Sequence, residues 1–204
     1  MPSERRARAA DQCTHVGEHR AAQQRALLDA AREVLAEGAT DIPSFGEVAA
    51  RAGLARSSMY QYFKSRQHLL QALIEDAFPR WSARVAAAMA HAGGPDRRVL
   101  AYIDANLDLV AEGEHAIATA LAQLAPGPEI DAKSRAMHDD LYTPLSDALR
   151  ELGASDVPAM SELINAVLHA ATRQVERGED VEQVRRTAAD LVRPYVADLA
   201  RRTG

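Results

Sequence analysis

Apolar residues recur at intervals of three and four along most of this chain, and this spacing constrains the fold more than any other feature. Such a stripe covers one face of an α-helix, which turns once in about 3.6 residues. Glycine and proline interrupt the pattern, and no stretch alternates for long enough to form a strand. We therefore predict an all-α protein of about nine helices. Its main stripes start at Leu27, Phe45, Leu70, Val99, Met137, Met160 and Val181.

Composition and cysteine content indicate a folded protein in a reducing compartment. Of the 204 residues, 47% are hydrophobic and 26% charged, which excludes disordered and collagen-like classes. The longest apolar run, 85–90, is far shorter than the ~20 residues that cross a bilayer, and there is no signal-peptide pattern. The one cysteine, Cys13, excludes an internal disulfide. We expect a cytoplasmic protein without a cofactor.

Charge is unevenly divided along the chain. Residues 1–70 hold ten Lys or Arg and eight Asp or Glu, a balance of +2, whereas residues 71–204 hold fourteen and twenty-one, a balance of −7. The formal net charge of −5 therefore hides a mildly basic segment. Only this first third is suited to meet a polyanion such as nucleic acid.

The strongest local signals lie in this basic third. Ser44 and Glu47 have the spacing of a capping box, in which each side chain bonds the other residue's backbone amide at the start of a helix. Gly53 is able to take the left-handed conformation that ends a helix. A second short helix is predicted around 56–63. Two short helices joined by a tight, glycine-containing turn are typical of a helix-turn-helix.

The second short helix is predicted to expose a polar face. Met59 and Phe63 lie four residues apart and are expected to face the core. The outward side chains are then all capable of hydrogen bonding: Arg56, Ser57, Tyr60, Gln61 and Lys64. Ser65 has the position of an N-cap for the following long helix. Backbone amides and Arg66 at that helix start are suited to bind a phosphate.

These motifs resemble the DNA-binding domain of the TetR family, the tetracycline-repressor-like regulators. The resemblance covers roughly residues 20–75. It lies in the Ala-x-x-Ala-Gly of 49–53, the Tyr-x-x-Phe of 60–63 and the Ser-basic pair at 65–66. Three positions depart from the usual pattern, because Ala55 stands where a capping serine is frequent, Ser57 where glycine is common, and Arg66 where lysine is usual.

The resemblance implies a fold with three parts. A flexible arm is expected over 1–18, a three-helix DNA-binding domain with a helix-turn-helix over 19–65, and an effector-binding and dimerisation domain over 66–204, joined to it by a long helix. The implied function is that of a homodimeric regulator of transcription, a repressor that a small molecule releases from its double-stranded DNA operator. An activator or an effector-independent DNA-binding regulator is the alternative. An enzyme is the remote alternative, because no catalytic motif is present.

For DNA, the residue chemistry and the resemblance together divide the contacts into two kinds. Arg56, Ser57 and Gln61 are expected at base edges, since arginine suits guanine and glutamine suits adenine by bidentate geometry. Ser58, in the same short helix, is a further candidate for a DNA contact. Phosphate contacts are expected from Ser44, Tyr60, Tyr62, Lys64 and Arg66. The alternative is a solvated helix face without a partner.

The acidic two-thirds are expected to hold the effector pocket. Large apolar surfaces with a few polar tips suit a small-molecule cavity, although each residue also fits a plain helical core. Asn165 and His169 lie four apart on a mostly apolar helix, and need partners if buried; a second subunit or an effector would supply them. The candidate effector-binding residues are Trp81, Met89, Tyr102, His115, Met137, Leu141, Tyr142, Asn165 and His169.

The last two stripes, 157–177 and 181–202, predict long amphipathic helices. In TetR-like proteins the last two helices pair with their mates as a four-helix bundle, and isologous pairing is the default symmetry of a dimer. The resemblance therefore implies a homodimer through these helices. The alternative is that they complete a bundle within one chain.

Two features near the N-terminus support weaker hypotheses. Arg5, Arg6 and Arg8 are suited to the minor groove or to phosphates, but we favour an untethered tail with a slight basic bias. Cys13, His15 and His19 are possible metal ligands by type only, because no predicted structure holds them in tetrahedral geometry. We expect no metal site.

Overall fold

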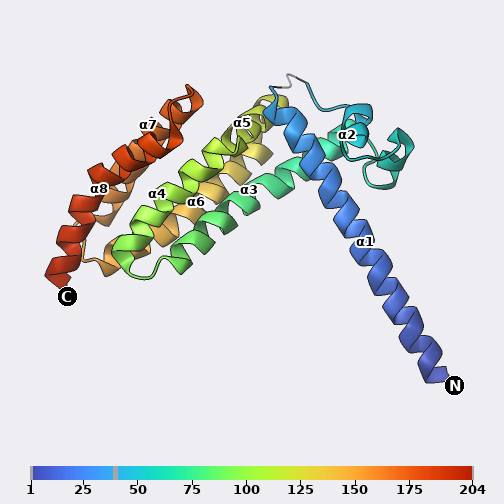
Figure 1. The fold of residues 1–204 in the computed structure, drawn as a ribbon, viewed down its shortest axis with the longest axis horizontal. Helices are drawn as coiled ribbons and strands as arrows, with labels where there is room; N and C mark the ends of the chain where they lie inside the picture. The colour runs from blue at the N-terminus through green and yellow to red at the C-terminus, as the bar shows by residue number, and fades with distance from the viewer. Residues whose placement is uncertain (1, 39–40, 204) are drawn as a thin grey trace. The chain divides into compact units, whose positions relative to one another are not determined.

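The computed structural model describes the backbone of residues 2–38 and 41–203, and the side chains within these ranges except those of 2–17 and 129. All the regular structure of these residues is helical, as predicted, with eight α-helices and one 3₁₀-helix (Figure 1). No described helix is long and apolar enough to span a membrane. The elements are α1 (Pro2–Ala36), α2 (Phe45–Arg51), η1 (Arg56–Gln61), α3 (Arg66–His91), α4 (Pro95–Ala111), α5 (Glu114–Leu124), α6 (Pro128–Glu151), α7 (Val157–Glu176) and α8 (Val181–Thr203).

The chain divides into two compact units, the first ending at Leu73 and the second beginning at Ile74. The sequence places this boundary earlier, after residue 65. The difference arises because the first turns of α3 belong to the first unit. Their side chains Leu69, Leu70 and Leu73 are fully buried. Helix α3 therefore contributes residues to both units.

Helix α1 begins at Pro2, so residues 2–18 are helical where the sequence predicts an arm without regular structure. That prediction used the absence of an apolar stripe. However, the segment is rich in alanine, arginine, glutamate and glutamine, which favour the helix intrinsically without any packing. Among the side chains of α1 that are described, from residue 18 onward, the first buried ones are Leu27 and Leu28.

The two ends of α2 have the structure that their sequence signals predict. Glu47 N donates to Ser44 Oγ at 3.2 Å and Ser44 N donates to Glu47 Oε2 at 2.9 Å, which completes the capping box. Gly53 adopts a φ of 69°, and Leu54 N donates back to Ala49 O at 2.8 Å, the pattern of a Schellman ending. Both caps are confirmed.

The second short helix is a 3₁₀-helix rather than an α-helix. It has only six residues, and Ala55 at its start provides no side-chain cap, a combination that favours the tighter, shorter form. Met59 and Phe63 are both fully buried, as predicted. The N-cap prediction for α3 also holds, since His68 N donates to Ser65 Oγ at 3.1 Å.

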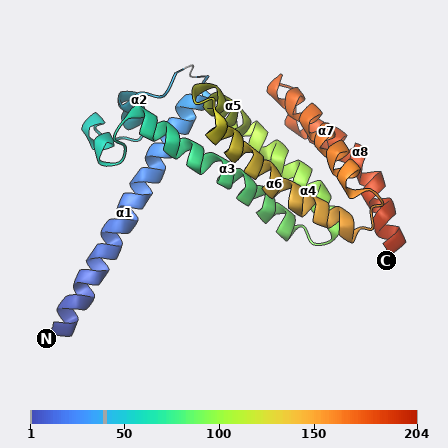
Figure 2. The same cartoon turned by 180° about the vertical axis from the view of Figure 1, so that it is seen from behind.

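In the second unit α4 is the central helix and packs against α5, α6, α7 and α8. Its stripe of Val99, Ile103 and Leu107 is fully buried. Helices α7 and α8 run side by side along one edge of this unit in both ribbon views (Figures 1 and 2). Their bounds agree closely with the two stripes predicted at the C-terminal end.

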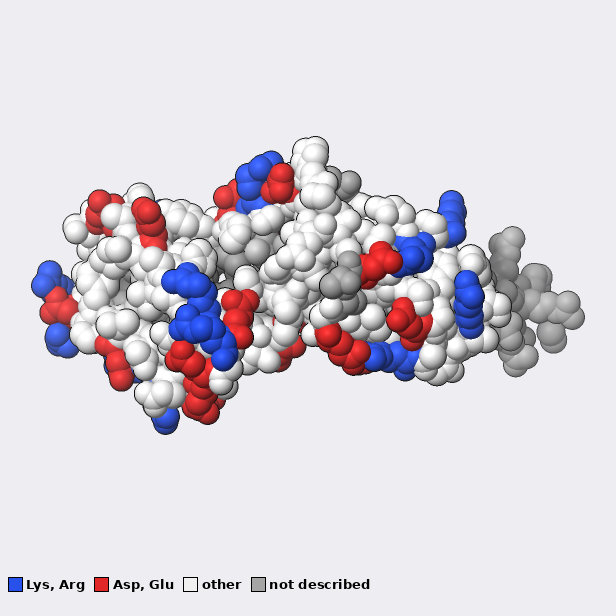
Figure 3. Space-filling view, turned by 90° about the horizontal axis from the view of Figure 1, so that it is seen from above, with Lys and Arg blue, Asp and Glu red and all other residues white. Residues whose placement is uncertain are grey.

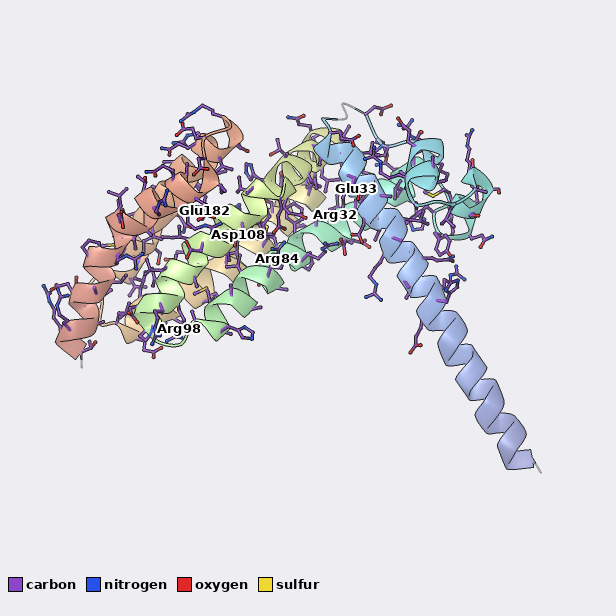
Figure 4. All side chains as sticks on the ribbon, viewed as in Figure 1. Arg32, Glu33, Arg84, Arg98, Asp108 and Glu182 are labelled. Atoms are coloured by element: carbon purple, nitrogen blue, oxygen red, sulfur yellow. The ribbon has the colours of Figure 1, made fainter. Side chains whose placement is uncertain are left out.

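Ion pairs connect α4 to its neighbours in the second unit. Arg84 of α3 donates to Glu112 at 2.8 Å. Arg185 of α8 bonds both Asp108, on α4, and Glu182, the latter at 3.1 Å. Asp108 and Glu182 lie close together on neighbouring helices in Figure 4. These partly exposed pairs fix orientation more than they add stability.

We predict that Ser44→Ala destabilises the first unit. The change removes the acceptor for Glu47 N, and loss of an N-cap side chain costs about 1 kcal/mol of unfolding free energy. Urea denaturation followed by circular dichroism measures the loss. Ser57→Ala, an exposed serine on η1, is the matched control and is expected to leave the midpoint unchanged; equal effects of the two changes would contradict the role of the cap.

Candidate functional site

Five exposed polar side chains of η1 and the residues after it form a continuous candidate surface, which we call the recognition surface: Arg56, Ser57, Tyr60, Gln61 and Lys64. It rests on the buried Met59 and Phe63. The ring of Phe45 packs edge-on against Tyr60 with centroids 5.2 Å apart, yet Tyr60 stays 60% exposed. A large aromatic side chain held in solvent by the core beneath it is available to a partner.

The positive charge of the recognition surface comes from Arg56 and Lys64. Neither has an acidic partner among the residues that the structure describes, so both charges remain available to an anion. By contrast, Arg51 on α2 is bound to Glu37 at 2.8 Å. Basic and acidic side chains are interspersed over the face of the molecule in Figure 3.

Three predicted DNA contacts, Tyr62, Ser44 and Arg66, bond other groups of the protein, and a fourth is half-buried. Tyr62 is half-buried and its hydroxyl donates to Gln23 of α1. Ser44 holds the capping box, and Ser58 is half-buried. Arg66 pairs with Asp41 at 2.9 Å and also donates to the carbonyl of residue 42, and its hydrogen bond lowers the pKa of Asp41.

Arg20 is a neighbour of this surface that the sequence analysis did not identify. Its guanidinium donates to Gln61 O at 2.9 Å and lies 5.8 Å from the centre of the Tyr62 ring. Forty-one residues separate Arg20 from Gln61, and no motif links them, so only the packing of α1 beside η1 reveals the contact.

The second unit encloses a cavity of about 290 Å³ bordered by α3, α4, α5, α6 and α7. The structure brings seven of the nine candidate effector residues to its wall: Trp81, Tyr102, His115, Met137, Leu141, Asn165 and His169. Met89 and Tyr142 do not line it. Met89 is buried in the core, and Tyr142 is 39% exposed on the surface of α6.

A chain of buried hydrogen bonds crosses one wall of the cavity. Trp81 Nε1 donates to Asn106 Oδ1 at 2.8 Å, and Asn106 Nδ2 donates to Tyr102 O at 2.7 Å. The Tyr102 hydroxyl donates to Asn165 Oδ1 at 2.6 Å. Asn165 therefore finds its partner within the chain, rather than in a second subunit or an effector. The chain joins α3, α4 and α7.

Burial changes the protonation chemistry of this wall. It raises the pKa of Tyr102 to about 12, so the phenol stays a hydrogen-bond donor at neutral pH. Burial, assisted by the nearby His169, lowers the pKa of His138. His115 contacts the Trp81 ring edge-on, with centroids 6.3 Å apart, and its Nδ1 lies 2.5 Å from Glu176 Oε1.

Several lining residues were missed by the sequence analysis, among them Phe78, Asn106, Asp131 and His138. A signal for some of them was present. Asn106 follows Tyr102 by four residues, on the same helical face. Asp131, Ser134 and His138 are spaced by three and four on α6 and share a face in the same way.

Metal binding has no structural support within the described side chains, where no cluster of three or more His, Cys, Asp or Glu is placed to hold an ion. Cys13 and His15, and likewise Arg5, Arg6 and Arg8, lie outside the residues whose side chains are described.

The paired helices α7 and α8 present an apolar groove of about 360 Å³ on the second unit. Small residues line its floor, including Ala166, Ala170 and Ala188. Leu163 and Leu191 border the groove and are 58% and 67% exposed. Large exposed apolar side chains beside an apolar groove are typical of interaction surfaces.

Comparison with known proteins identifies the first unit. Residues 27–73 match the family described as "Bacterial regulatory proteins, tetR family". The chain carries a TetR-family DNA-binding domain. The match includes α2, η1 and the recognition surface, so these elements are the helix-turn-helix of that domain.

One curated relative extends this match. The HTH-type transcriptional repressor LfrR of Mycolicibacterium smegmatis is 35% identical over 85 residues, which are 42% of this chain and 44% of that protein. The chain thus aligns with less than half of this relative, which is a regulator of transcription rather than an enzyme.

Solved structures of TetR-like regulators share the fold over most of the chain. SCO4454 from Streptomyces coelicolor has a TM-score of 0.69 at 22% identity, and covers 92% of this chain and 95% of its own. LfrR from Mycobacterium smegmatis, in complex with proflavine, has a TM-score of 0.61 at 24% identity, covering 83% and 94%. FadR from Bacillus subtilis, in complex with stearoyl-CoA, has a TM-score of 0.62 at 21% identity, covering 82% and 96%. The second unit therefore has the fold of the C-terminal domain of TetR-like regulators, as the resemblance implied.

Proposed function

We propose that this protein is a homodimeric, ligand-responsive repressor of transcription. The recognition surface carries the proposal, because it combines an exposed tyrosine and an amide with two cations that have no acidic partner among the described residues, all on a TetR-family helix-turn-helix. In this arrangement Arg56 and Gln61 read base edges in the major groove, while Tyr60 and Lys64 contact phosphates. Ser57 is small enough to accept several bases.

The remaining predicted DNA contacts are proposed to position η1 or to bind phosphate. Tyr62 and Ser58 are half-buried, and Ser44 caps α2. Their packing is proposed to set the angle at which η1 meets the DNA. Arg66, paired with Asp41, is proposed to share its guanidinium with a phosphate at the start of α3.

The cavity in the second unit is proposed to bind the effector. Two proteins with the same fold are described in complex with small molecules, LfrR with proflavine and FadR with stearoyl-CoA. Here α3 supplies Phe78 and Trp81 to the cavity wall, and its first turns belong to the DNA-binding unit. A ligand that repacks Trp81 therefore acts on a helix shared with that unit. A coupling of ~1–3 kcal/mol suffices to change operator affinity ~5–150-fold.

A second copy of this chain is proposed to cover the groove of α7 and α8. Alanines on the floor let two helix pairs approach closely, and Leu163 and Leu191 from each copy become buried. A two-fold pair also presents two recognition surfaces to two half-sites. Effector-independent binding or activation of transcription would use the same DNA surface without the release step.

We predict that Arg56→Ala and Tyr60→Ala weaken DNA binding while the fold is retained. Duplexes bound by the wild-type protein are selected from a randomised pool, and affinities are measured by fluorescence anisotropy. Loss of a base contact at Arg56 is expected to cost about 1–3 kcal/mol, and Lys64→Ala is expected to lower the salt slope by about one. Arg97→Ala, an exposed arginine of α4, is the control. Unchanged affinity in all three variants would contradict the recognition surface.

We predict that Leu163→Asp combined with Leu191→Asp yields a monomer. Burying a charge at an apolar interface is strongly unfavourable, so the copies are expected to separate while each remains helical. Sedimentation equilibrium measures the mass, with Tyr142→Asp as control because Tyr142 is exposed outside α7 and α8. A monomeric wild-type protein, or a dimeric double variant, would overturn the proposed interface.

We predict that Ala118→Trp makes the repressor insensitive to effector. The indole fills the cavity from α5, where Ala118 lines it, so operator binding persists but release is lost. Compounds that raise the melting temperature of the wild-type protein in a library screen are added to the operator complex of each variant. The control is Ala116→Trp, which lies on the exposed side of α5. If the same compounds release Ala118→Trp as well, the effector binds elsewhere.

A further inference from the structure

We infer that the cavity is selective for cationic, planar aromatic ligands and discriminates against anionic ones. This inference rests on the proposed effector site and adds the chemical class of its ligand. It follows from three properties of the wall: the sign of its charges, the arrangement of its aromatic rings, and the state of its hydrogen-bond donors.

The charges that line the cavity are of one sign. Among the described residues of its wall there is no lysine or arginine, and Asp131 at the start of α6 is the one carboxylate. Glu176 lies just behind the wall, bound to His115. An anion entering this space would lose its hydration without meeting a compensating cation, which is costly. A cation would be attracted to Asp131, although water weakens this attraction because Asp131 is exposed.

The three histidines do not reverse this balance. Burial and the neighbouring His169 lower the pKa of His138, so its neutral form prevails at neutral pH. His115 shares its Nδ1 with the Glu176 carboxylate, which offsets any proton that it carries. The third, His169, is exposed on α7, next to water that screens its charge.

The aromatic residues suit a flat cation. Trp81, Phe78 and Tyr102 all lie in the wall, and each is at least nine-tenths buried. The faces of such rings attract cations, tryptophan most strongly, and the attraction grows when water is excluded. A volume of about 290 Å³ accommodates a fused ring system of two or three rings and excludes long chains.

Some of the polar groups in the wall are already committed to one another. Asn106 uses both its oxygen and its nitrogen, in bonds to Trp81 and Tyr102. The hydroxyl proton of Tyr102 is donated to Asn165. A carboxylate or phosphate ligand would have to break these bonds to obtain donors from Asn106 or Tyr102. The hydroxyls of Thr119, Ser134 and Thr172 also line the cavity, but as neutral groups they do not offset the charge of an anion.

Three probes with the same ring system separate the effect of ligand charge on binding from the effect of ligand shape. They are the cation N-methylphenanthridinium, neutral phenanthridine and the anion phenanthridine-6-carboxylate, titrated into the DNA-free protein at pH 7.5. Trp81 is the single tryptophan of the chain, so quenching of its fluorescence reports occupancy of this cavity, and calorimetry gives the dissociation constants. The variants are Asp131→Asn and, as control, Asp147→Asn, which makes the same charge change on the surface of the same helix.

The cation is expected to bind about three- to tenfold more tightly than the neutral probe, and the anion most weakly. Asp131→Asn is expected to weaken binding of the cation about two- to fivefold and to leave the affinity for the neutral probe unchanged. Asp147→Asn is expected to change neither affinity. Tightest binding by the anion, or an unchanged preference for the cation in Asp131→Asn, would overturn the inference while leaving the effector site itself standing. Absence of binding by all three probes, with no quenching of Trp81, would overturn both.

Discussion

Burial of α4 on several sides is the constraint on which the second unit depends. A helix that packs against α5, α6, α7 and α8 has to be apolar on more than one face. Val99, Ile103 and Leu107 are buried on one side of α4, and Leu109 and Val110 are buried as well. Its two buried polar positions, Tyr102 and Asn106, are tolerated because they bond to α3 and α7. The same residues that make the core specific thus form the wall of the cavity. In this protein the cavity is a part of the core where packing is incomplete.

The first unit is organised differently, by local caps. Helix α2 has only seven residues and η1 six, too few to be stable alone. The capping box at Ser44 and the Schellman ending at Gly53 satisfy the free backbone groups at both ends of α2. Buried Met59 and Phe63 then hold η1 against that framework. The outward side chains are consequently free to vary, so a domain of this kind can change its target without losing its fold.

The sequence alone predicts most of this architecture, because caps and stripes are local. The caps of α2, the buried pair in η1 and the bounds of α7 and α8 all come from spacings of a few residues. Errors occur where tertiary context decides. The helical form of residues 2–18 depends on intrinsic propensity without a stripe, and Leu69 to Leu73 pack with residues far back in the chain. Likewise, no short-range pattern indicates that Tyr102 meets Asn165 or that Arg20 meets Gln61.

The pairing of Arg66 with Asp41 has a consequence for selectivity. A guanidinium at the start of α3 attracts any duplex equally, because phosphates carry no base information. The carboxylate of Asp41 offsets part of the positive charge of Arg66. The hydrogen bond from Arg66 lowers the pKa of Asp41 and so favours its ionised form. Replacement of Asp41 by a neutral residue would therefore strengthen adhesion to bulk genomic DNA together with adhesion to the true target. The added attraction is the same for both, so the protein would bind DNA more tightly without becoming more selective.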